Sequence, residues 1–109
     1  MKEFNFTQQT EWQQTADKGV TRQVMSYNEE LMVVRVKFES GAAGKDHTHP
    51  HTQISYVESG RFEYHIEDRK EEIGAGDSVV IAGNLVHGCK CIEAGVLIDC
   101  FSPMRKDFV

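Results

Sequence analysis

Three histidines and a glutamine at alternate positions are the residues best suited to chemistry in this chain. Each lies two positions from the next, in the order His47, His49, His51 and Gln53. Side chains two apart on an extended strand point to the same face, so we expect this face to be polar. Such a face would be a poor part of an apolar core, whereas neutral imidazole is the commonest metal ligand in proteins. The spacing therefore predicts a metal site.

His51 is the weakest ligand candidate of this group. It follows Pro50, which cannot donate a hydrogen bond to a strand ladder and favours a turn at this point. Two roles stay open for His51: a metal ligand, or a residue at the mouth of the site that contacts a bound molecule.

A further ligand is expected from a second stretch of the chain, residues 76–87. Gly76 and Asp77 begin a short strand after a tight turn, and residues 82–84 (Ala-Gly-Asn) form a second turn. His87 then begins the next strand, where it can face the first histidines. We expect His87 to complete the site.

The C-terminal part of the chain offers a carboxylate, an aromatic ring and a guanidinium group. Alternation over residues 96–101 places Asp99 and Phe101 on one face of a strand and three apolar side chains on the other. If the first face lines the cavity, Asp99 lies near the metal and Phe101 is an apolar wall. Arg105 would then curl over the opening, where Arg recognises carboxylates bidentately. The alternative is an edge-strand Asp in water and a surface Arg.

The elements that must hold these residues are short and rich in β-forming residues. Turn signals recur at the spacing typical of an all-β sandwich or barrel. The charged run 67–72 is expected to be a solvated turn, and residues 58–60 another. Helix signals are weak: residues 10–18 are expected to form one or two turns, with Trp12 packed against the barrel. The predicted strands are Leu31–Phe38, Ile54–Val57, Arg61–Ile66, Ser78–Ile81, Val86–Ile92 and Val96–Phe101.

Composition excludes several classes of protein. The chain has 109 residues, 39% apolar and 27% charged, which fits one ordinary globular domain. Its net charge of −5 argues against a nucleic-acid partner. No apolar run is long enough to span a bilayer, and the polar start lacks the pattern of a signal peptide, so we expect no membrane partner and a cytoplasmic location. The cysteines Cys89, Cys91 and Cys100 are interpreted as free thiols packed as small apolar groups.

The first histidine stretch resembles the first motif of the cupin superfamily. That motif runs from a Gly through His-x-His and a Glu to a second Gly. Here the corresponding residues, all at the required spacing, are Gly41, His47, His49, Gln53 in place of Glu, and Gly60.

The second stretch resembles the second cupin motif, with Gly76 and His87 in register. It departs from that motif at Ala82, Asn84 and Cys91, which affects the turn rather than the ligand.

The cupin resemblance implies an all-β, single-domain double-stranded β-helix, or jelly-roll barrel, over residues 1–109. Residues 1–30 would be an N-terminal strand and turn extension, and residues 41–60 and 76–91 the two metal-binding motifs. It also implies one divalent metal ion (Zn, Ni, Mn, Fe or Co). Gln in place of Glu removes a negative charge and favours a Lewis acid over a redox centre. The implied metal ligands are His47, His49, Gln53 and His87.

The tail D-x-F-x-P-x-R-x-D-F and the string H-x-H-P-H-x-Q resemble the KdgF group of pectin degradation proteins, which are small cupins. This resemblance runs from about residue 41 to the C-terminus and does not include the first 30 residues. It implies metal-dependent conversion of 4,5-unsaturated uronates to the open-chain 4-deoxy-5-keto form, with Asp99, Phe101 and Arg105 as catalytic residues. A small-molecule sugar acid would be the partner, and family analogy implies a homodimer.

Three other functions remain open. A metal-dependent dioxygenase or a sugar isomerase would use the same barrel, and the dioxygenase would need iron and would consume oxygen. A non-catalytic module would bind a sugar acid without consuming it, although no helix-turn-helix is left outside the barrel for a DNA-binding regulator. A purely structural cupin is disfavoured because all four ligand positions are filled.

Overall fold

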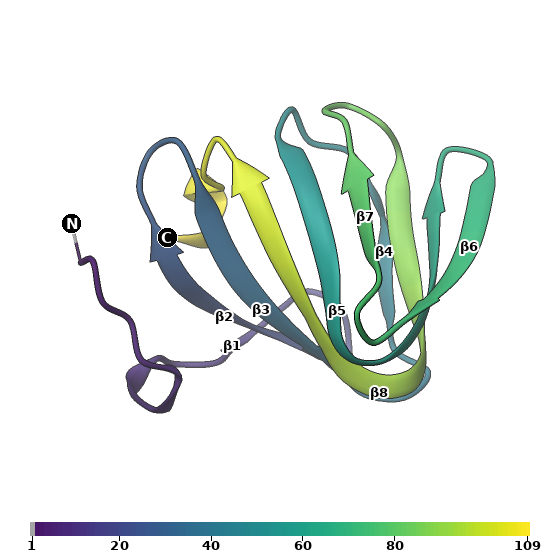
Figure 1. The fold of residues 1–109 in the computed structure, drawn as a ribbon, viewed down its shortest axis with the longest axis horizontal. Helices are drawn as coiled ribbons and strands as arrows, with labels where there is room; N and C mark the ends of the chain where they lie inside the picture. Colours follow the sequence, from purple (N-terminus) through teal and green to yellow (C-terminus); the bar gives the residue numbers. More distant parts are fainter. Residues whose placement is uncertain (1) are drawn as a thin grey trace.

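The computed structural model describes residues 2–109, and nearly all of its regular structure is β-strand (Figure 1). Two single turns of 3-10 helix, η1 and η2, lie near the ends of the chain. The elements in chain order are η1 (Thr7–Gln9), β1 (Gln13–Gln14), β2 (Val20–Tyr27), β3 (Met32–Phe38), β4 (Ala43–His47), β5 (Thr52–Ile66), β6 (Arg69–Gly74), β7 (Ser78–Ile81), β8 (His87–Ser102) and η2 (Lys106–Phe108).

The strands form one antiparallel sheet that folds back into two facing layers (Figure 1). One layer has the order β1-β2-β3-β8-β5-β7, and it uses the second half of β8 and the first half of β5. The other layer has the order β4-β8-β5-β6, and it uses the remaining halves of the same two strands. The all-β jelly-roll class expected from the sequence is therefore confirmed.

Alternation along the strands buries one face of each layer between them. On β5, for example, Ser55 and Val57 are fully buried, whereas Ile54 and Tyr56 between them are each 46% exposed. Burial of the inward-facing apolar side chains stabilises the fold by roughly 1.5–3 kcal/mol for each large one. The largest of them are Phe62, Met32, Ile81 and Leu97.

The long strands β5 and β8 are antiparallel neighbours that bend together near their middle, and this bend makes two sequence predictions wrong. Residues 58–60 are not a turn, because β5 continues through them with a shift in register. Residues 86–92 and 96–101 are not two strands but parts of β8. Gly60 has φ 85°, and a Cβ there would lie 2.5 Å from the carbonyl oxygen of Glu93. Glycine thus marks a close approach of two paired strands here, and not the end of a strand.

Other predicted boundaries were confirmed or corrected by the structure. The strands at Leu31–Phe38 and Ser78–Ile81 are confirmed as β3 and β7. The charged run 67–72 is mostly strand, because the turn takes only two residues before β6 begins at Arg69. The bounds of β2 were not predicted, although it lies within the strand and turn extension expected over residues 1–30, and β4 was not predicted. The charged run 67–72 is confirmed as solvated, since its side chains are exposed.

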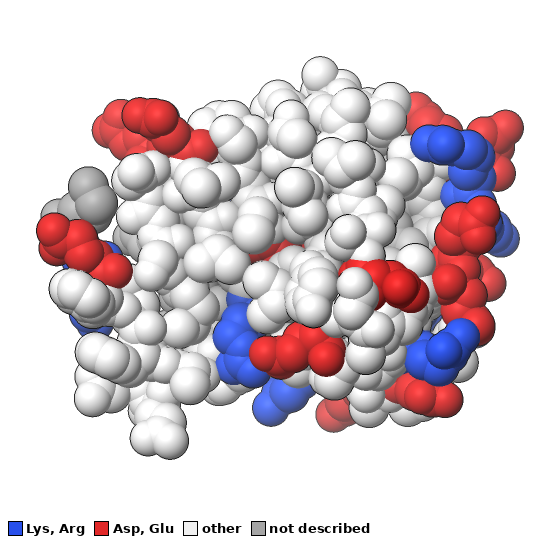
Figure 2. Space-filling model, viewed as in Figure 1, with Lys and Arg blue, Asp and Glu red and all other residues white. Residues whose placement is uncertain are grey.

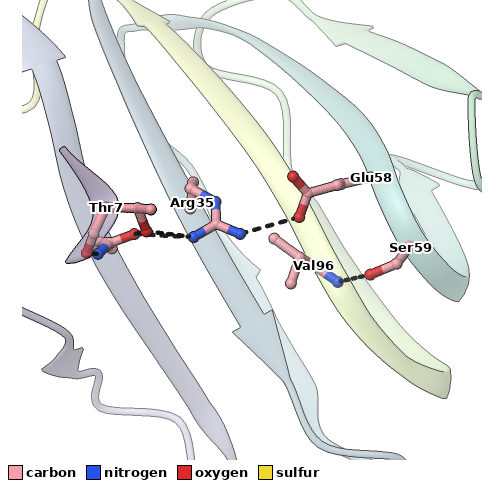
Figure 3. A network of polar contacts seen from close by, with 6 residues as sticks. Thr7, Arg35, Glu58, Ser59 and Val96 are labelled. Carbon is pink, nitrogen blue, oxygen red and sulfur yellow. Dashed lines mark hydrogen bonds and ion pairs between the residues drawn. The ribbon is translucent and has the colours of Figure 1, made fainter. Parts of the chain in front are cut away.

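The helix predicted over residues 10–18 is wrong, because this segment lies extended on the outer face of the sheet. It contains only the two-residue strand β1, after the short η1 turn. Trp12 does pack against the sheet, with its ring 4.7 Å from Lys37 Nζ and 5.5 Å from the guanidinium carbon of Arg35. Arg35 also donates to Thr7 Oγ1 at 3.0 Å and to Glu58 at 3.1 Å (Figure 3). Cation–π and polar contacts thus replace helical hydrogen bonds here.

The structure also shows the state of the cysteines and the character of the helical turns. The three cysteines are free, as expected. Burial raises the pKa of Cys89 to about 12, which keeps that thiol protonated and unreactive. Among residues 2–109, neither helical turn approaches the length and apolar character that crossing a membrane requires.

Candidate metal and substrate site

The predicted metal-site residues come from three strands and one loop. His47 ends β4, Gln53 is the second residue of β5, and His87 begins β8. His49 lies in the loop that joins β4 to β5. Residues 47–53 are therefore not one extended strand: the chain turns at residues 48–51, next to Pro50, where the sequence favours a turn.

The loop that carries His49 is fixed by the turn between β7 and β8. The backbone N–H of Asn84 donates to the carbonyl oxygen of His49 at 2.7 Å. A Cβ at Gly83 would lie 2.5 Å from the carbonyl oxygen of Pro50, so only glycine allows this approach. The two segments that the cupin pattern connects at sequence level are thus bonded directly to each other.

Three imidazole rings converge on one point. The ring centroids of His47 and His87 are 4.3 Å apart, and those of His49 and His87 are 4.8 Å apart. One nitrogen from each ring lies within 4.8 Å of the others, close enough for a single metal ion. His49 and His87 are buried, whereas His47 is exposed at the mouth.

Each of these rings donates its Nδ1 hydrogen to a backbone carbonyl oxygen. The acceptors are Lys45 O for His47 at 2.8 Å, His51 O for His49 at 3.1 Å, and Leu85 O for His87 at 3.0 Å. Because a carbonyl oxygen only accepts, Nδ1 must carry the hydrogen in all three rings. The neutral rings therefore present the lone pair of Nε2, the arrangement typical of histidines that bind metal.

Gln53 adds an oxygen to the same point. Its side-chain Oε1 lies 2.9 Å from His49 Nε2 and 3.2 Å from His87 Nε2. The amide nitrogen of Gln53 points away and donates to Ser55 Oγ at 3.0 Å. In neutral rings, lone pairs would face one another across these short distances, and a divalent cation would turn that repulsion into coordination. The residues therefore fit a bound metal ion.

Burial favours the neutral form of His49 and His87, which leaves these two rings ready to bind a cation. Burial, together with the smaller effect of the neighbouring histidines, lowers the pKa of His87 to about 4. Burial also lowers the pKa of His49. A proton therefore competes weakly for these nitrogens near neutral pH.

A buried polar chain links the metal-site glutamine to Asp99. Ser55 Oγ donates to Asp99 Oδ1 at 2.6 Å and lies 3.1 Å from the Tyr64 hydroxyl. Since the Ser55 hydrogen goes to Asp99, Tyr64 donates to Ser55. Sequence analysis missed Ser55 and Tyr64. A signal for Ser55 was present, because it follows Gln53 by two positions and must share its face.

Asp99 lies inside the barrel, as expected if its face lines the cavity. Burial raises its pKa to about 6, while the hydrogen bond from Ser55 and the charge of Arg105 act in the opposite direction. Its second oxygen, Oδ2, makes no hydrogen bond within residues 2–109. Burial also raises the pKa of Tyr64 well above its ordinary value, so this hydroxyl stays protonated.

The aromatic and cationic residues near the C-terminus meet at the other side of the cavity. The Phe101 ring is 5.7 Å from the His49 ring and 5.7 Å from the Phe108 ring. The Arg105 guanidinium lies 5.2 Å from the Phe101 centroid, and both of its outer edge nitrogens, Nε and Nη2, donate to Asp107. The segment after β8 therefore does fold over the opening.

His51 lies outside the cluster of three histidines. Its ring packs edge-on against His49 with centroids 5.3 Å apart, and its carbonyl accepts the His49 hydrogen. The Nδ1 atom of His51 is buried without a hydrogen-bond partner in the described chain. The His51 side chain thus packs against the His49 ring from outside the cluster.

A cavity of about 380 Å³ joins the histidine cluster to the C-terminal residues. Its wall includes Asp99, Phe101 and Arg105, as predicted. It also includes Arg22 from β2, which sequence analysis did not single out. A larger hollow of about 780 Å³ lies beyond Phe108 and contains none of the predicted site residues.

Comparison with known proteins gives consistent matches. The family model described as "Cupin domain" matches residues 34–99. The pectin degradation protein KdgF of Dickeya dadantii (strain 3937) is 40% identical over the full length of both chains. The crystal structure of an RmlC-like cupin from Shewanella frigidimarina NCIMB 400 superposes with a TM-score of 0.95 at 40% identity, covering 100% of this chain and 97% of that one. The structure of KdgF from Halomonas sp. superposes with a TM-score of 0.92 at 35% identity over both whole chains.

Proposed function

The chain belongs to the cupin family, and from this premise we propose that it is a metal-dependent enzyme of pectin degradation. Its reaction would open 4,5-unsaturated uronates to the linear 4-deoxy-5-keto form. One observation carries the proposal: a single cavity contains a cluster of imidazole lone pairs, a buried carboxylate with a free oxygen, and guanidinium groups. These are the groups that a ring-opening proton transfer on a sugar acid requires.

In this proposal one divalent metal ion is held by the ligands His47, His49, Gln53 and His87. All four are neutral, so the ion would keep its full charge at the site. When bound, such an ion supplies Lewis-acid stabilisation of negative charge on a substrate oxygen. Zn, Ni, Mn, Fe and Co all suit this set of imidazole and amide ligands.

Asp99 is the group that moves the proton. The free oxygen Oδ2 takes the hydrogen of the anomeric hydroxyl as the bond between C1 and the ring oxygen breaks, which leaves an aldehyde at C1 and an enolate at C5. Asp99 then returns this proton to C4, and the enolate becomes the ketone at C5. The reaction is an isomerisation, so no atom or electron is gained or lost.

Other side chains orient Asp99 and the substrate. Ser55, itself held by Tyr64, fixes one carboxylate oxygen of Asp99 and leaves the other for the sugar. Phe101 packs on the sugar and keeps Asp99 away from bulk water. Arg105 pairs with the substrate carboxylate through nitrogens that its contact with Asp107 leaves free.

The direct test is incubation of the metal-loaded protein with a 4,5-unsaturated uronate. We expect the ultraviolet absorbance of the C4–C5 double bond to fall faster than in buffer alone, with the linear ketone as product and no oxygen consumed. Protein stripped of metal with a chelator should show the uncatalysed rate. A wild-type rate equal to that in buffer would refute the proposal, and oxygen consumption would favour a dioxygenase.

We also propose that the protein is a homodimer that pairs through the outer face of β5 and β7. Ile54 and Val80 lie opposite each other on this face and are 46% and 64% exposed, beside the exposed ring of Tyr56. On the side of the molecule seen in Figure 2, the upper middle is free of charged side chains, which gather at the left and right edges and in the lower middle. Sedimentation should give a dimer for wild type and a monomer for Val80→Glu, and a wild-type monomer would contradict the proposal.

A further inference from the structure

Arg22 is a charged residue on the inward face of a strand. Its strand, β2, faces the core with Val20, Arg22 and Val24. These residues stand opposite Phe38, Val36 and Val34 of β3, which are all apolar. A guanidinium group in an apolar row costs solvation energy, so burial lowers the pKa of Arg22 even though the nearby Asp107 opposes this.

The side chain of Arg22 reaches the wall of the cavity that holds the histidine cluster and Asp99. Its guanidinium carbon lies 3.8 Å from the centroid of the Phe108 ring, and its Nε donates to Gln13 Oε1 at 3.2 Å. Neither Nη1 nor Nη2 donates a hydrogen bond to any of residues 2–109. Two amino groups of a half-buried cation are thus held in place without an acceptor.

Arg105 differs in this respect, although it stacks on the same ring. Its guanidinium carbon lies 4.4 Å from the Phe108 centroid, but the carboxylate of Asp107 takes hydrogen bonds from its Nε at 3.1 Å and from its Nη2 at 2.9 Å. This contact uses one bidentate edge of the guanidinium and balances its charge. Asp107 attracts the charge of Arg22 but takes no hydrogen bond from it, so Arg22 is the guanidinium on this side of the cavity whose two Nη groups are both free of acceptors in the described part of the chain.

We propose that Arg22 binds the carboxylate of the substrate and shares it with the free Nη1 of Arg105. This inference rests on the proposed function and adds a recognition residue from the N-terminal part of the chain. The carboxylate would receive hydrogen bonds from two guanidinium groups that are both positioned by Phe108. Arg22 would then make the enzyme specific for uronic acids over neutral sugars or esters of the same shape.

The test compares an unsaturated uronate with its methyl ester, which lacks the negative charge. For Arg22→Gln we expect kcat/KM on the acid to fall by about 100-fold, mainly through KM, because a charge-assisted hydrogen bond is lost. The value on the ester should change by less than about threefold, so the preference for the acid collapses. A merely structural role would lower both values equally. An unchanged preference for the acid would overturn the proposal.

The matched control is Arg61→Gln, which removes the same charge from an exposed position paired with Glu72. It should keep the wild-type preference for the acid. Arg22→Lys should retain part of that preference, because it restores the positive charge without the planar fork. It also serves as the test variant if Arg22→Gln does not fold.

A binding measurement separates this inference from the proposed reaction. Calorimetric titration with galacturonate, a saturated uronate that cannot react, should show binding to wild type and about 100-fold weaker binding to Arg22→Gln at equal metal content. If wild type binds galacturonate in this Arg22-dependent way but does not turn over the unsaturated uronate, the proposed reaction fails and the carboxylate site stands. If wild type does not bind galacturonate, the carboxylate site is wrong.

Discussion

The cavity has two walls that are built in different ways. On the histidine wall, each ring is fixed by a backbone carbonyl within two residues of it. On the arginine wall, Arg22 and Arg105 are positioned by other side chains, above all by the Phe108 ring. Backbone acceptors fix the direction of a ring, whereas stacking leaves a long side chain room to adjust. The first wall is thus suited to hold an ion, and the second to close around a ligand.

The largest expected effect comes from breaking the histidine wall. For His49→Ala we expect bound metal, measured by elemental analysis, to fall from about one ion per chain to almost none, with loss of turnover. His51→Ala is the matched control and should keep the metal, because its side chain lies outside the cluster. If His51→Ala lost the metal and His49→Ala kept it, the assignment of the ion to this wall would be wrong.

The next effect comes from the group between the two walls. Asp99→Asn should keep the metal and the fold but lower turnover by about 10²- to 10⁴-fold, because the amide cannot carry the proton. Rates on the unsaturated uronate, together with metal content, measure this directly. Full activity of this variant would exclude Asp99 from proton transfer.

Ser55→Ala should have a smaller effect, since it removes the residue that orients Asp99. We expect turnover to fall by about tenfold and the free energy of unfolding, from urea titration, to fall by about 1–3 kcal/mol, because buried partners lose a hydrogen bond. Ser55→Thr keeps the hydroxyl and controls for its loss. Equal turnover in Ser55→Ala and wild type would show that Asp99 needs no such support.

The smallest effect should come from the aromatic ring that positions the arginine wall. Phe108→Ala removes the ring on which both guanidinium groups stack, and each such contact contributes about 0.5–2 kcal/mol. We expect galacturonate binding, followed by calorimetry, to weaken by up to about tenfold. Metal content should not change. Phe4→Ala, at a position 76% exposed, is the control. Loss of metal in Phe108→Ala would mean that the two walls are not independent.

The same contrast explains what the sequence could predict. The sequence could predict that His47, His49 and His87 lie together, because these residues lie beside turns that the sequence marks with proline and glycine. Strand β3 was predicted because its run is rich in residues that favour β-strands. The class of fold followed from these patterns and from the cupin motifs.

The remaining features depend on contacts between distant segments. A glycine that ends a strand looks the same in the sequence as Gly60, where two paired strands bend and approach closely, so β5 and β8 were each divided in two. The bounds of β2 were not predicted, so the side of the strand on which Arg22 lies could not be assigned. Tyr64 contacts Ser55 only because β5 bends between these two residues. Such relations arise from tertiary packing and leave no local periodicity.

The carbonyl anchors of the three imidazole rings have a consequence for how such a centre could be moved between proteins. Because His47, His49 and His87 each find their acceptor on their own short peptide, ring orientation travels with that peptide. Two segments of about ten residues each would carry the geometry into another jelly roll of the same curvature. The arginine wall could not be moved in this way, since its two guanidinium groups depend on the ring of Phe108. It would have to be redesigned for each new scaffold and ligand.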